Sequence, residues 1–217
     1  MSIELTANEA RVIGVLMEKS VLTPEVYPMT LNSLTNACNQ KSSRDPVMAL
    51  EPGKVQATLR GLETKHLVRV EENFKSAVEK YTQRLCNTPF SDYSFDAAGF
   101  AVICVLLLRG KRTPGELRAN SGRLHDFADN QAVSDTLQSL IDREGGPVVV
   151  ELPRTPGRRD PEYMHLLCGP VDTSAAATQS ARQPSERGRP QESIAVEARL
   201  KALEEAVAEL RALIEAR

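Results

Sequence analysis

The 217-residue chain has no tryptophan, and only 4% of its residues are aromatic. Its four cysteines, Cys38, Cys86, Cys104 and Cys168, are far apart in the sequence, so we expect no disulfides. No apolar run approaches the roughly 20 residues needed to cross a bilayer, and the polar first residues do not resemble a secretory leader. These absences predict a cytoplasmic protein without a membrane partner.

The chain also lacks an excess of charge of either sign. It carries 27 Lys and Arg against 29 Asp and Glu, which gives a net charge of −2. The balance is nearly even within residues 1–90, 91–170 and 171–217. Because proteins that bind DNA regardless of sequence usually carry a strong basic excess, the composition argues against that simple class.

Motifs that carry catalysis are missing too. The sequence has no Gly-rich phosphate loop, no HExxH motif and no CxxC pair. Its three histidines, His66, His125 and His165, are far apart. We therefore expect no enzymatic activity, no cofactor and no metal site.

What the chain does contain is an internal repeat. Residues 5–24 align without a gap on residues 95–114, and seven of the twenty positions are identical. A second stretch matches at an offset of 78, and a tyrosine recurs as Tyr81 and Tyr163. Duplication at this spacing predicts two small domains of one fold, residues 1–90 and 91–170.

Each repeat predicts three helices. Thr6 and Glu9 form a capping box ahead of the first helix, and Asp96 takes the cap position in the second copy. Second helices are expected near 30–38 and 114–122, the latter opened by the capping box of Thr113 and Glu116 with a proline between them. Third helices are expected near 52–65 and 131–143, with inward residues Val55, Leu59 and Leu62 in the first copy and Val133, Leu137, Leu140 and Ile141 in the second.

Two strand-like runs follow each third helix, at residues 67–71 and 80–85 and at residues 147–152 and 162–167. Three helices followed by a β-hairpin are the winged-helix variant of helix-turn-helix. The predicted fold is mainly α with small β-hairpins, arranged as two tandem winged-helix domains and a C-terminal heptad helix. Since the repeat offset falls from 90 to 78, the first copy holds 12 extra residues between its first and third helices.

The C-terminal region has a different composition. Residues 171–192 contain few apolar side chains and predict a disordered linker. Residues 193–217 space their apolar residues alternately four and three apart, which predicts a coiled coil and a homodimer. A helix that docks on its own chain is the alternative, because three heptads are marginally stable alone. The seam consists of Val196, Leu200, Leu203, Val207, Leu210 and Ile214.

Several long strings resemble a known family. Asn36–Met48, Leu22–Pro28, Leu107–Leu117 and Leu152–Gly157 are similar to the YceH-like family of bacterial proteins. The resemblance covers roughly residues 3–169 and implies a tandem winged-helix fold. The family has no established function, so the resemblance implies no catalytic or ligand-binding residues.

The third helix of the first repeat is the usual recognition helix. Its predicted outer face carries Lys54, Gln56, Arg60, Glu63 and Thr64. Lys and Arg can contact phosphates, and Gln56 or Arg60 could reach base edges. The alternative is an ordinary solvated helix face.

Two further segments carry candidate contacts. Lys41 and Arg44 lie in the polar connection before the recognition helix. They could contact a phosphate or a protein partner. Alternatively, the polar side chains of this connection cap their own backbone in turns. Arg154, Arg158 and Arg159 lie at the wing tip of the second repeat, where they could clamp phosphates or simply keep the loop solvated.

The third helix of the second repeat is acidic. Its outer face shows Ser134, Asp135, Gln138, Asp142 and Glu144, whose carboxylates would repel a polyphosphate. A protein-facing role or plain solvation therefore suits it better.

Two functions remain open. One is regulatory binding of double-stranded DNA, with the 52–65 helix in a major groove, the wing arginines on the backbone and the coiled coil spacing two half-sites. The other is a protein–protein adaptor that uses winged-helix domains without DNA contact, favoured by the weak charge balance.

Overall fold

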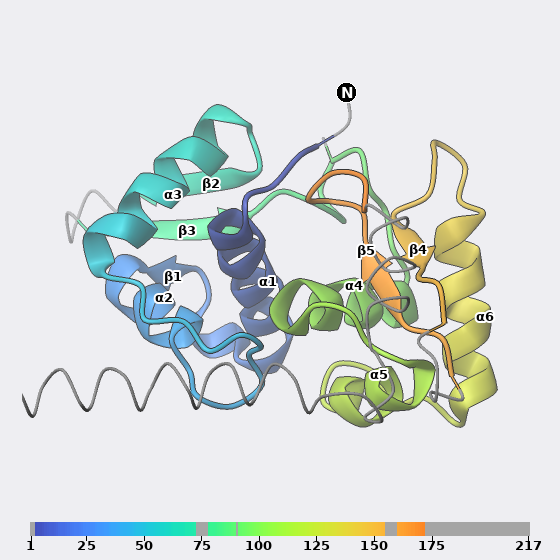
Figure 1. Ribbon diagram of the computed structural model, residues 1–217. Helices are drawn as coiled ribbons and strands as arrows, with labels where there is room; N and C mark the ends of the chain where they lie inside the picture. Colours follow the sequence, from blue (N-terminus) through green and yellow to red (C-terminus); the bar gives the residue numbers. More distant parts are fainter. Residues whose placement is uncertain (1–2, 73–77, 90, 155–159, 172–217) are drawn as a thin grey trace, which may run out of the picture. The chain divides into compact units, whose positions relative to one another are not determined.

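The computed structural model describes residues 3–72, 78–89, 91–154 and 160–171. Within these ranges the chain forms six α-helices and two small antiparallel sheets (Figure 1). The prediction of a mainly helical fold with small hairpins is confirmed at this level. Among the described helices, none is both long and apolar enough to cross a membrane.

The first half of the described chain runs helix, helix, helix, hairpin. Its elements are α1 (Ala7–Leu22), the 3₁₀ turn η1 (Pro24–Val26), β1 (Met29–Thr30), α2 (Leu31–Cys38), α3 (Pro52–Thr64), β2 (Val68–Glu72) and β3 (Glu79–Gln83). The sheet order is β1-β3-β2, and β3 is antiparallel to both neighbours. The predicted capping box begins α1: the Thr6 hydroxyl accepts from the Glu9 amide at 3.3 Å, and the Glu9 carboxylate accepts from the Thr6 amide at 2.8 Å.

The second half repeats that order. Its elements are α4 (Ala97–Arg109), α5 (Pro114–Ser121), α6 (Asn130–Ile141), β4 (Val149–Glu151) and β5 (Tyr163–His165). The Asp96 carboxylate caps α4 by accepting from the Gly99 amide at 2.8 Å. Thr113 and Glu116 form the predicted capping box of α5. Local capping chemistry therefore sets the start of both helices, as the sequence indicated.

The repeated tyrosines hold equivalent places in the two sheets. Tyr81 of β3 pairs with Met29, which lies just before α2. Tyr163 of β5 exchanges backbone hydrogen bonds with Arg112, just before α5, at 3.0 and 2.8 Å. The sequence did not predict β1, because a two-residue strand is defined by its partner and has no periodicity of its own.

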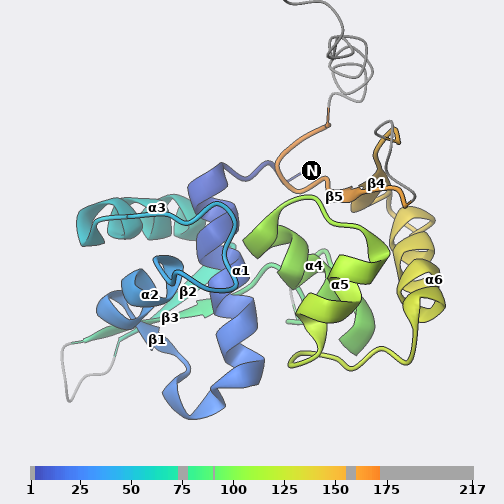
Figure 2. The ribbon, with the colours of Figure 1, turned by 60° about the horizontal axis from the view of Figure 1, so that its bottom comes forward.

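α1 and α4 pack against each other between the two halves (Figures 1 and 2). A Cβ atom on Gly14 would lie 3.0 Å from the Leu107 Cβ and 3.0 Å from the Leu108 side chain, so the helices approach closely. Residues 9–18 of α1 and 99–108 of α4 are buried on every side. One hydrophobic core therefore continues from the first half into the second.

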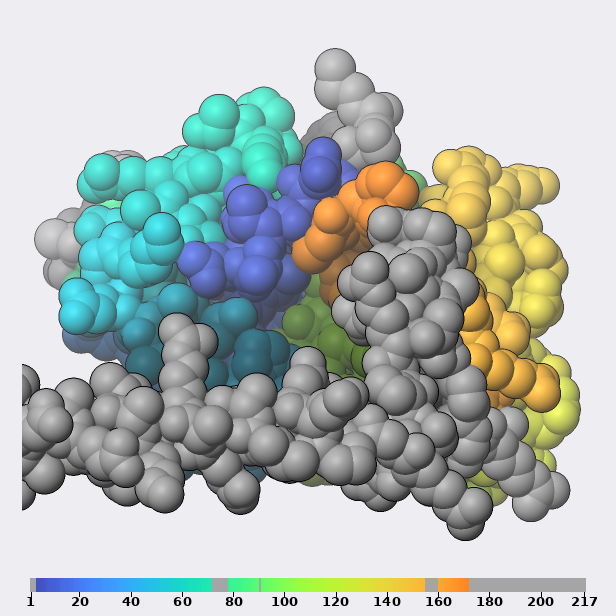
Figure 3. All heavy atoms as spheres, in the orientation of Figure 1, coloured from blue at the N-terminus to red at the C-terminus, as the bar shows by residue number. Residues whose placement is uncertain are grey.

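The ends of the described core also meet. The Leu5 amide donates to the Leu167 carbonyl at 2.8 Å. Figure 3 shows the N-terminal segment beside the segment that follows β5 on the surface. Residues 172–192 of the predicted linker and the predicted heptad helix, 193–217, lie outside the described residues.

Candidate nucleic-acid interface

α3 presents one face to the core and the other to solvent. Val55, Leu59 and Leu62 are buried as predicted. Pro52 occupies the first helical turn, where its missing N–H costs no hydrogen bond. The outer face, with the predicted residues Lys54, Gln56, Arg60, Glu63 and Thr64, is exposed except for the half-buried Gln56.

The cations of this face are free of ion pairs with the described residues. Within the described residues, no carboxylate oxygen lies within 4.0 Å of the charged nitrogens of Lys54 or Arg60. Lys65, just beyond α3, is instead held by Glu9 at 2.8 Å. The Thr64 hydroxyl donates back to the Arg60 carbonyl at 3.0 Å. Lys54 and Arg60 are thus the side chains of α3 best placed to meet a phosphate.

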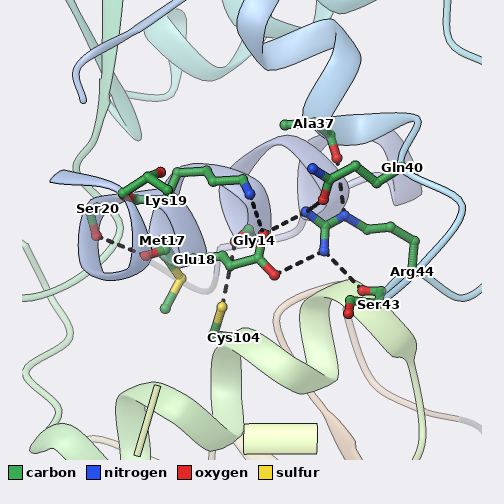
Figure 4. Close-up of polar contacts among 11 residues, drawn as sticks. Gly14, Met17, Glu18, Lys19, Ser20, Ala37, Gln40, Ser43, Arg44 and Cys104 are labelled. Atoms are coloured by element: carbon green, nitrogen blue, oxygen red, sulfur yellow. Dashed lines mark hydrogen bonds and ion pairs between the residues drawn. The ribbon is translucent and has the colours of Figure 1, made fainter. Parts of the chain in front are cut away.

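The connection between α2 and α3 separates its two candidate cations. Lys41 is exposed, but Arg44 is only 4% exposed. The Arg44 Nη1 and Nη2 atoms donate to the two carboxylate oxygens of Glu18 at 3.0 and 2.6 Å (Figure 4). Its guanidinium also donates to the Ala37 carbonyl, the Ser43 carbonyl and the Gln40 side chain. Arg44 therefore holds the connection against α1, and we leave it out of the proposed interface.

A second buried arginine supports the same connection. Arg11 of α1 is 2% exposed and donates to the Cys38 carbonyl at 3.0 Å and to the Pro46 carbonyl at 2.6 Å. Sequence reasoning missed Arg11 and Glu18. The available signal was two opposite charges, seven residues apart on one face of an otherwise apolar stretch of helix.

The environment of Glu18 keeps it ionised. Burial alone would raise the pKa of Glu18, but the hydrogen bonds and positive charge of Arg44, helped by Lys19, outweigh burial and lower that pKa. The carboxylate and the guanidinium form a bidentate pair, which fixes direction as well as distance. The pair therefore acts as a rigid link between α1 and the connection.

The connection also reaches the second half of the chain. The Asp45 amide donates to the Leu108 carbonyl, near the end of α4, at 3.0 Å. The Asp45 carboxylate accepts from Arg112 Nη2 at 2.7 Å. These contacts give the polar connection a structural role between the two halves. Of its two candidate cations, Lys41 is the one that stays exposed.

The outer face of α6 is acidic, as predicted. Asp135 and Asp142 are exposed and accept from the side-chain amides of Gln131 and Gln138 at 2.8 and 2.7 Å. No described lysine or arginine lies within 4.0 Å of either carboxylate. This face would repel a phosphate backbone and suits a basic partner.

The remaining candidates divide between described and undescribed parts. Arg154 is exposed and lies two residues beyond the strand-like run 147–152 that contains β4. Arg158 and Arg159 lie outside the described residues, as do the seam residues Val196, Leu200, Leu203, Val207, Leu210 and Ile214. The described chain contains no group of three or more His, Cys, Asp or Glu placed to hold a metal ion.

Comparison with known proteins identifies relatives over almost the whole chain. Residues 5–158 match the family described as "Protein of unknown function, DUF480". A UPF0502 protein of Vibrio atlanticus is 47% identical over 215 residues, which cover 99% of each chain. The UPF0502 protein YceH of Escherichia fergusonii is 47% identical over 211 residues, 97% of this chain and 94% of the relative. The likeness thus extends beyond residues 3–169, over which the sequence motifs were recognised.

Proposed function

The chain belongs to the YceH-like UPF0502 family of unknown function, and we propose that it is a regulatory DNA-binding protein of two winged-helix domains. The proposal assigns it a binding role without catalysis, in the cytoplasm. The order of three helices and an antiparallel hairpin in each half supports the winged-helix assignment. In that fold, α3 is the helix that enters the major groove.

The observation that carries the proposal is the pair of unpaired cations on α3. Lys54 and Arg60 are exposed and have no ion-pair partner in the described chain, whereas Arg44, Lys65, Lys111 and Arg112 do. Lys41 and Arg154 are exposed candidates for backbone contact, together with the predicted Arg158 and Arg159. Phosphate contacts of this kind set position and affinity, and Gln56 or Arg60 would supply base readout.

Fluorescence anisotropy with a labelled random duplex at low salt tests this proposal. We expect binding that weakens steeply with salt, because each neutralised phosphate releases counterions. Lys54→Glu combined with Arg60→Glu should abolish it. Arg123→Glu, which reverses an exposed cation outside the proposed interface, is the control and should bind nearly as well as the parent. No retention of DNA by the parent at low salt would refute the proposal.

The acidic face of α6 favours a second candidate, a protein–protein adaptor. Asp135 and Asp142 offer exposed carboxylates without a cationic partner in the described chain. An adaptor of this kind would capture a basic protein partner, and Asp135→Lys with Asp142→Lys should release it. DNA binding that disappears in Lys54→Glu/Arg60→Glu, with no partner sensitive to the α6 variants, would exclude the adaptor.

We also propose that the heptad seam makes the protein a homodimer. Two copies would then place two α3 helices for two half-sites. Leu203→Glu with Leu210→Glu should halve the mass measured by sedimentation equilibrium, since charges at core positions disrupt a coiled coil. An unchanged mass would favour the alternative, a terminal helix that docks on its own chain.

A further inference from the structure

The turn between α6 and β4 is longer than its counterpart in the first half. Seven residues join Ile141 to Val149, whereas three residues join α3 to β2. Two of the seven, Gly145 and Gly146, have φ angles of 92° and 104°, in the left-handed region that favours glycine. Since the first half makes the same connection in three residues, the fold does not require the extra length. Loops of this kind often carry binding residues.

This turn forms part of the wall of an open groove of about 460 Å³. The rest of the wall comes from the N-terminal segment, from Tyr93 before α4 and from the segment that follows β5. The N-terminal segment and the segment after β5 lie side by side on the surface (Figure 3). The volume is within the range of about 300–1,000 Å³ that is typical of ligand sites. Of the apolar side chains in the wall, Ile3 and Leu166 are partly exposed and Pro147 is exposed.

The carboxylates around the groove make it acidic. The carboxylate of Glu4 belongs to the wall, because a Cβ atom on Gly169 would lie 3.0 Å from its Oε1 atom. Asp92 and Glu144 each directly precede a wall residue, and both are exposed. No lysine or arginine nitrogen of the described chain lies within 4.0 Å of these three carboxylates.

Two cations near the groove are already engaged. The guanidinium carbon of Arg143 lies over the Tyr93 ring, 5.1 Å from its centroid. Lys65 donates to the backbone carbonyl of Glu4 at 2.9 Å, but its charge is paired with the Glu9 carboxylate at 2.8 Å. Even if Arg143 offsets one of the three negative charges, an excess of negative charge remains. This excess favours a partner that carries positive charge.

We propose that the groove binds a basic segment of a partner protein through one apolar anchor side chain. The anchor enters the groove beside Ile3, Pro147 and Leu166. Lysines or arginines on either side of the anchor meet Glu4 and Glu144. An apolar centre with a charged rim is the usual anatomy of a protein interface.

The inference rests on the adaptor function, the second candidate above, and supplies its site and the chemistry of its partner. It does not depend on DNA binding, because α3 contributes nothing to the wall of the groove. Peptide binding can therefore be measured without DNA.

A tryptophan-centred peptide tests the proposal on the full chain. The chain has no tryptophan, so indole emission reports the surroundings of the peptide alone. The probe is a nonapeptide with a central tryptophan flanked on each side by alternating lysine and serine. We expect saturable binding at low salt and a shift of the emission to shorter wavelength, because the indole leaves water. Binding without this shift, or no saturable binding, would overturn the groove as an anchor site.

Two altered peptides separate the anchor from the charge, each measured in competition with the first peptide. Serine in place of the central tryptophan should weaken binding at least about tenfold, since the apolar side chain supplies the buried contact area. Glutamate in place of every lysine should abolish binding. Equal binding of either altered peptide would refute the proposal.

Charge reversal on the protein locates the contact. Glu4→Lys with Glu144→Lys should weaken the peptide about tenfold, because two attractions become repulsions. Glu25→Lys with Asp126→Lys is the matched control, since it changes the net charge equally at exposed positions outside the groove. The control should bind nearly as well as the parent. Equal losses in the two variants would mean that net charge alone attracts the peptide, which would refute the site.

The outer face of α6 gives a third comparison. Asp135→Lys with Asp142→Lys should weaken the peptide less than Glu4→Lys with Glu144→Lys does. The opposite order would place the basic partner on the outer face of α6. That result would overturn the groove and leave the adaptor function standing.

Discussion

The thiol sulfur of Cys104 lies 3.5 Å from the carbonyl oxygen of Gly14, which is its own counterpart in the internal repeat (Figure 4). α1 and α4 thus meet at equivalent positions of the two copies. The contact is also reciprocal. Gly14 faces Leu107 and Leu108. Cys104 in turn lies near Glu18, the counterpart of Leu108, whose charge adds to burial in raising the pKa of the Cys104 thiol. Contacts between equivalent residues characterise a two-fold interface between identical subunits.

This meeting point predicts that Gly14→Ala destabilises the protein. Alanine would gain about 1 kcal/mol in helix propensity, but its Cβ would lie 3.0 Å from the Leu107 Cβ, which cannot move without the backbone. We expect a net loss of about 1–3 kcal/mol in the free energy of unfolding, measured in urea. Gly53→Ala is the matched control: its Cβ meets nothing within 4 Å, so it should be neutral or stabilising.

The sequence predicted local structure here better than contacts between the halves. Helix starts are set by residues three apart, so the capping residues Thr6, Asp96 and Thr113 could be recognised without any partner. Residues 102–108 of α4 are all apolar, which by itself indicates a core helix, but their burial on every side depends on α1, which lies 90 residues away. In the sequence, Gly14 is simply a residue of weak helix propensity. A glycine is needed there because Leu107 and Leu108 of α4 pack against it, and only the fold brings them close.

Replacing Glu18 by glutamine should cost about 3–5 kcal/mol. The substitution removes the charge that holds the buried Arg44 guanidinium and leaves that cation without its ion-pair partner. Chemical denaturation measures the loss. Lys41→Gln, an exposed position in the same connection, is the control and should change stability by less than about 0.5 kcal/mol.

A double replacement separates the pair from its parts. Glu18→Leu with Arg44→Met leaves no buried charge behind and should be less destabilising than either single change. Strict additivity of the two single losses would contradict the assigned pair, because it would mean that the side chains do not interact.

The same pair predicts a pH dependence. The pKa of Glu18 in the folded protein is lowered below its usual value of 4.5, because Arg44 outweighs the effect of burial. Its stabilising contribution is therefore complete above about pH 4.5 and is lost as the pH falls through the folded pKa. The stability difference between the parent protein and Glu18→Gln should be constant near neutral pH and shrink in acid. A difference that grows on acidification would reverse the assigned direction.

The candidate interface shows the limit of a linear reading in another way. Lys41 and Arg44 lie three residues apart in one polar segment and looked alike as phosphate contacts. Their roles diverge because Glu18, from a different helix, faces only Arg44. Exposure of Lys54 and Arg60 was predictable, because helical spacing of Val55, Leu59 and Leu62 fixes which side of α3 is inward.

Thiol chemistry should distinguish one cysteine from the other three. Burial raises the pKa of Cys38 and of Cys86 to about 12 and raises that of Cys104 well above its usual value, so their reactive thiolates are scarce and enclosed. Cys168 is only half-buried, and although burial and the charges of Glu9 and Glu4 raise its pKa, its thiol is the one that a reagent can reach. With Ellman's reagent at pH 8, we expect one thiol per chain to react rapidly in the native protein and four in denaturant. Cys168→Ser should remove the rapid phase, and a rapid phase that survives this change would place the accessible thiol elsewhere.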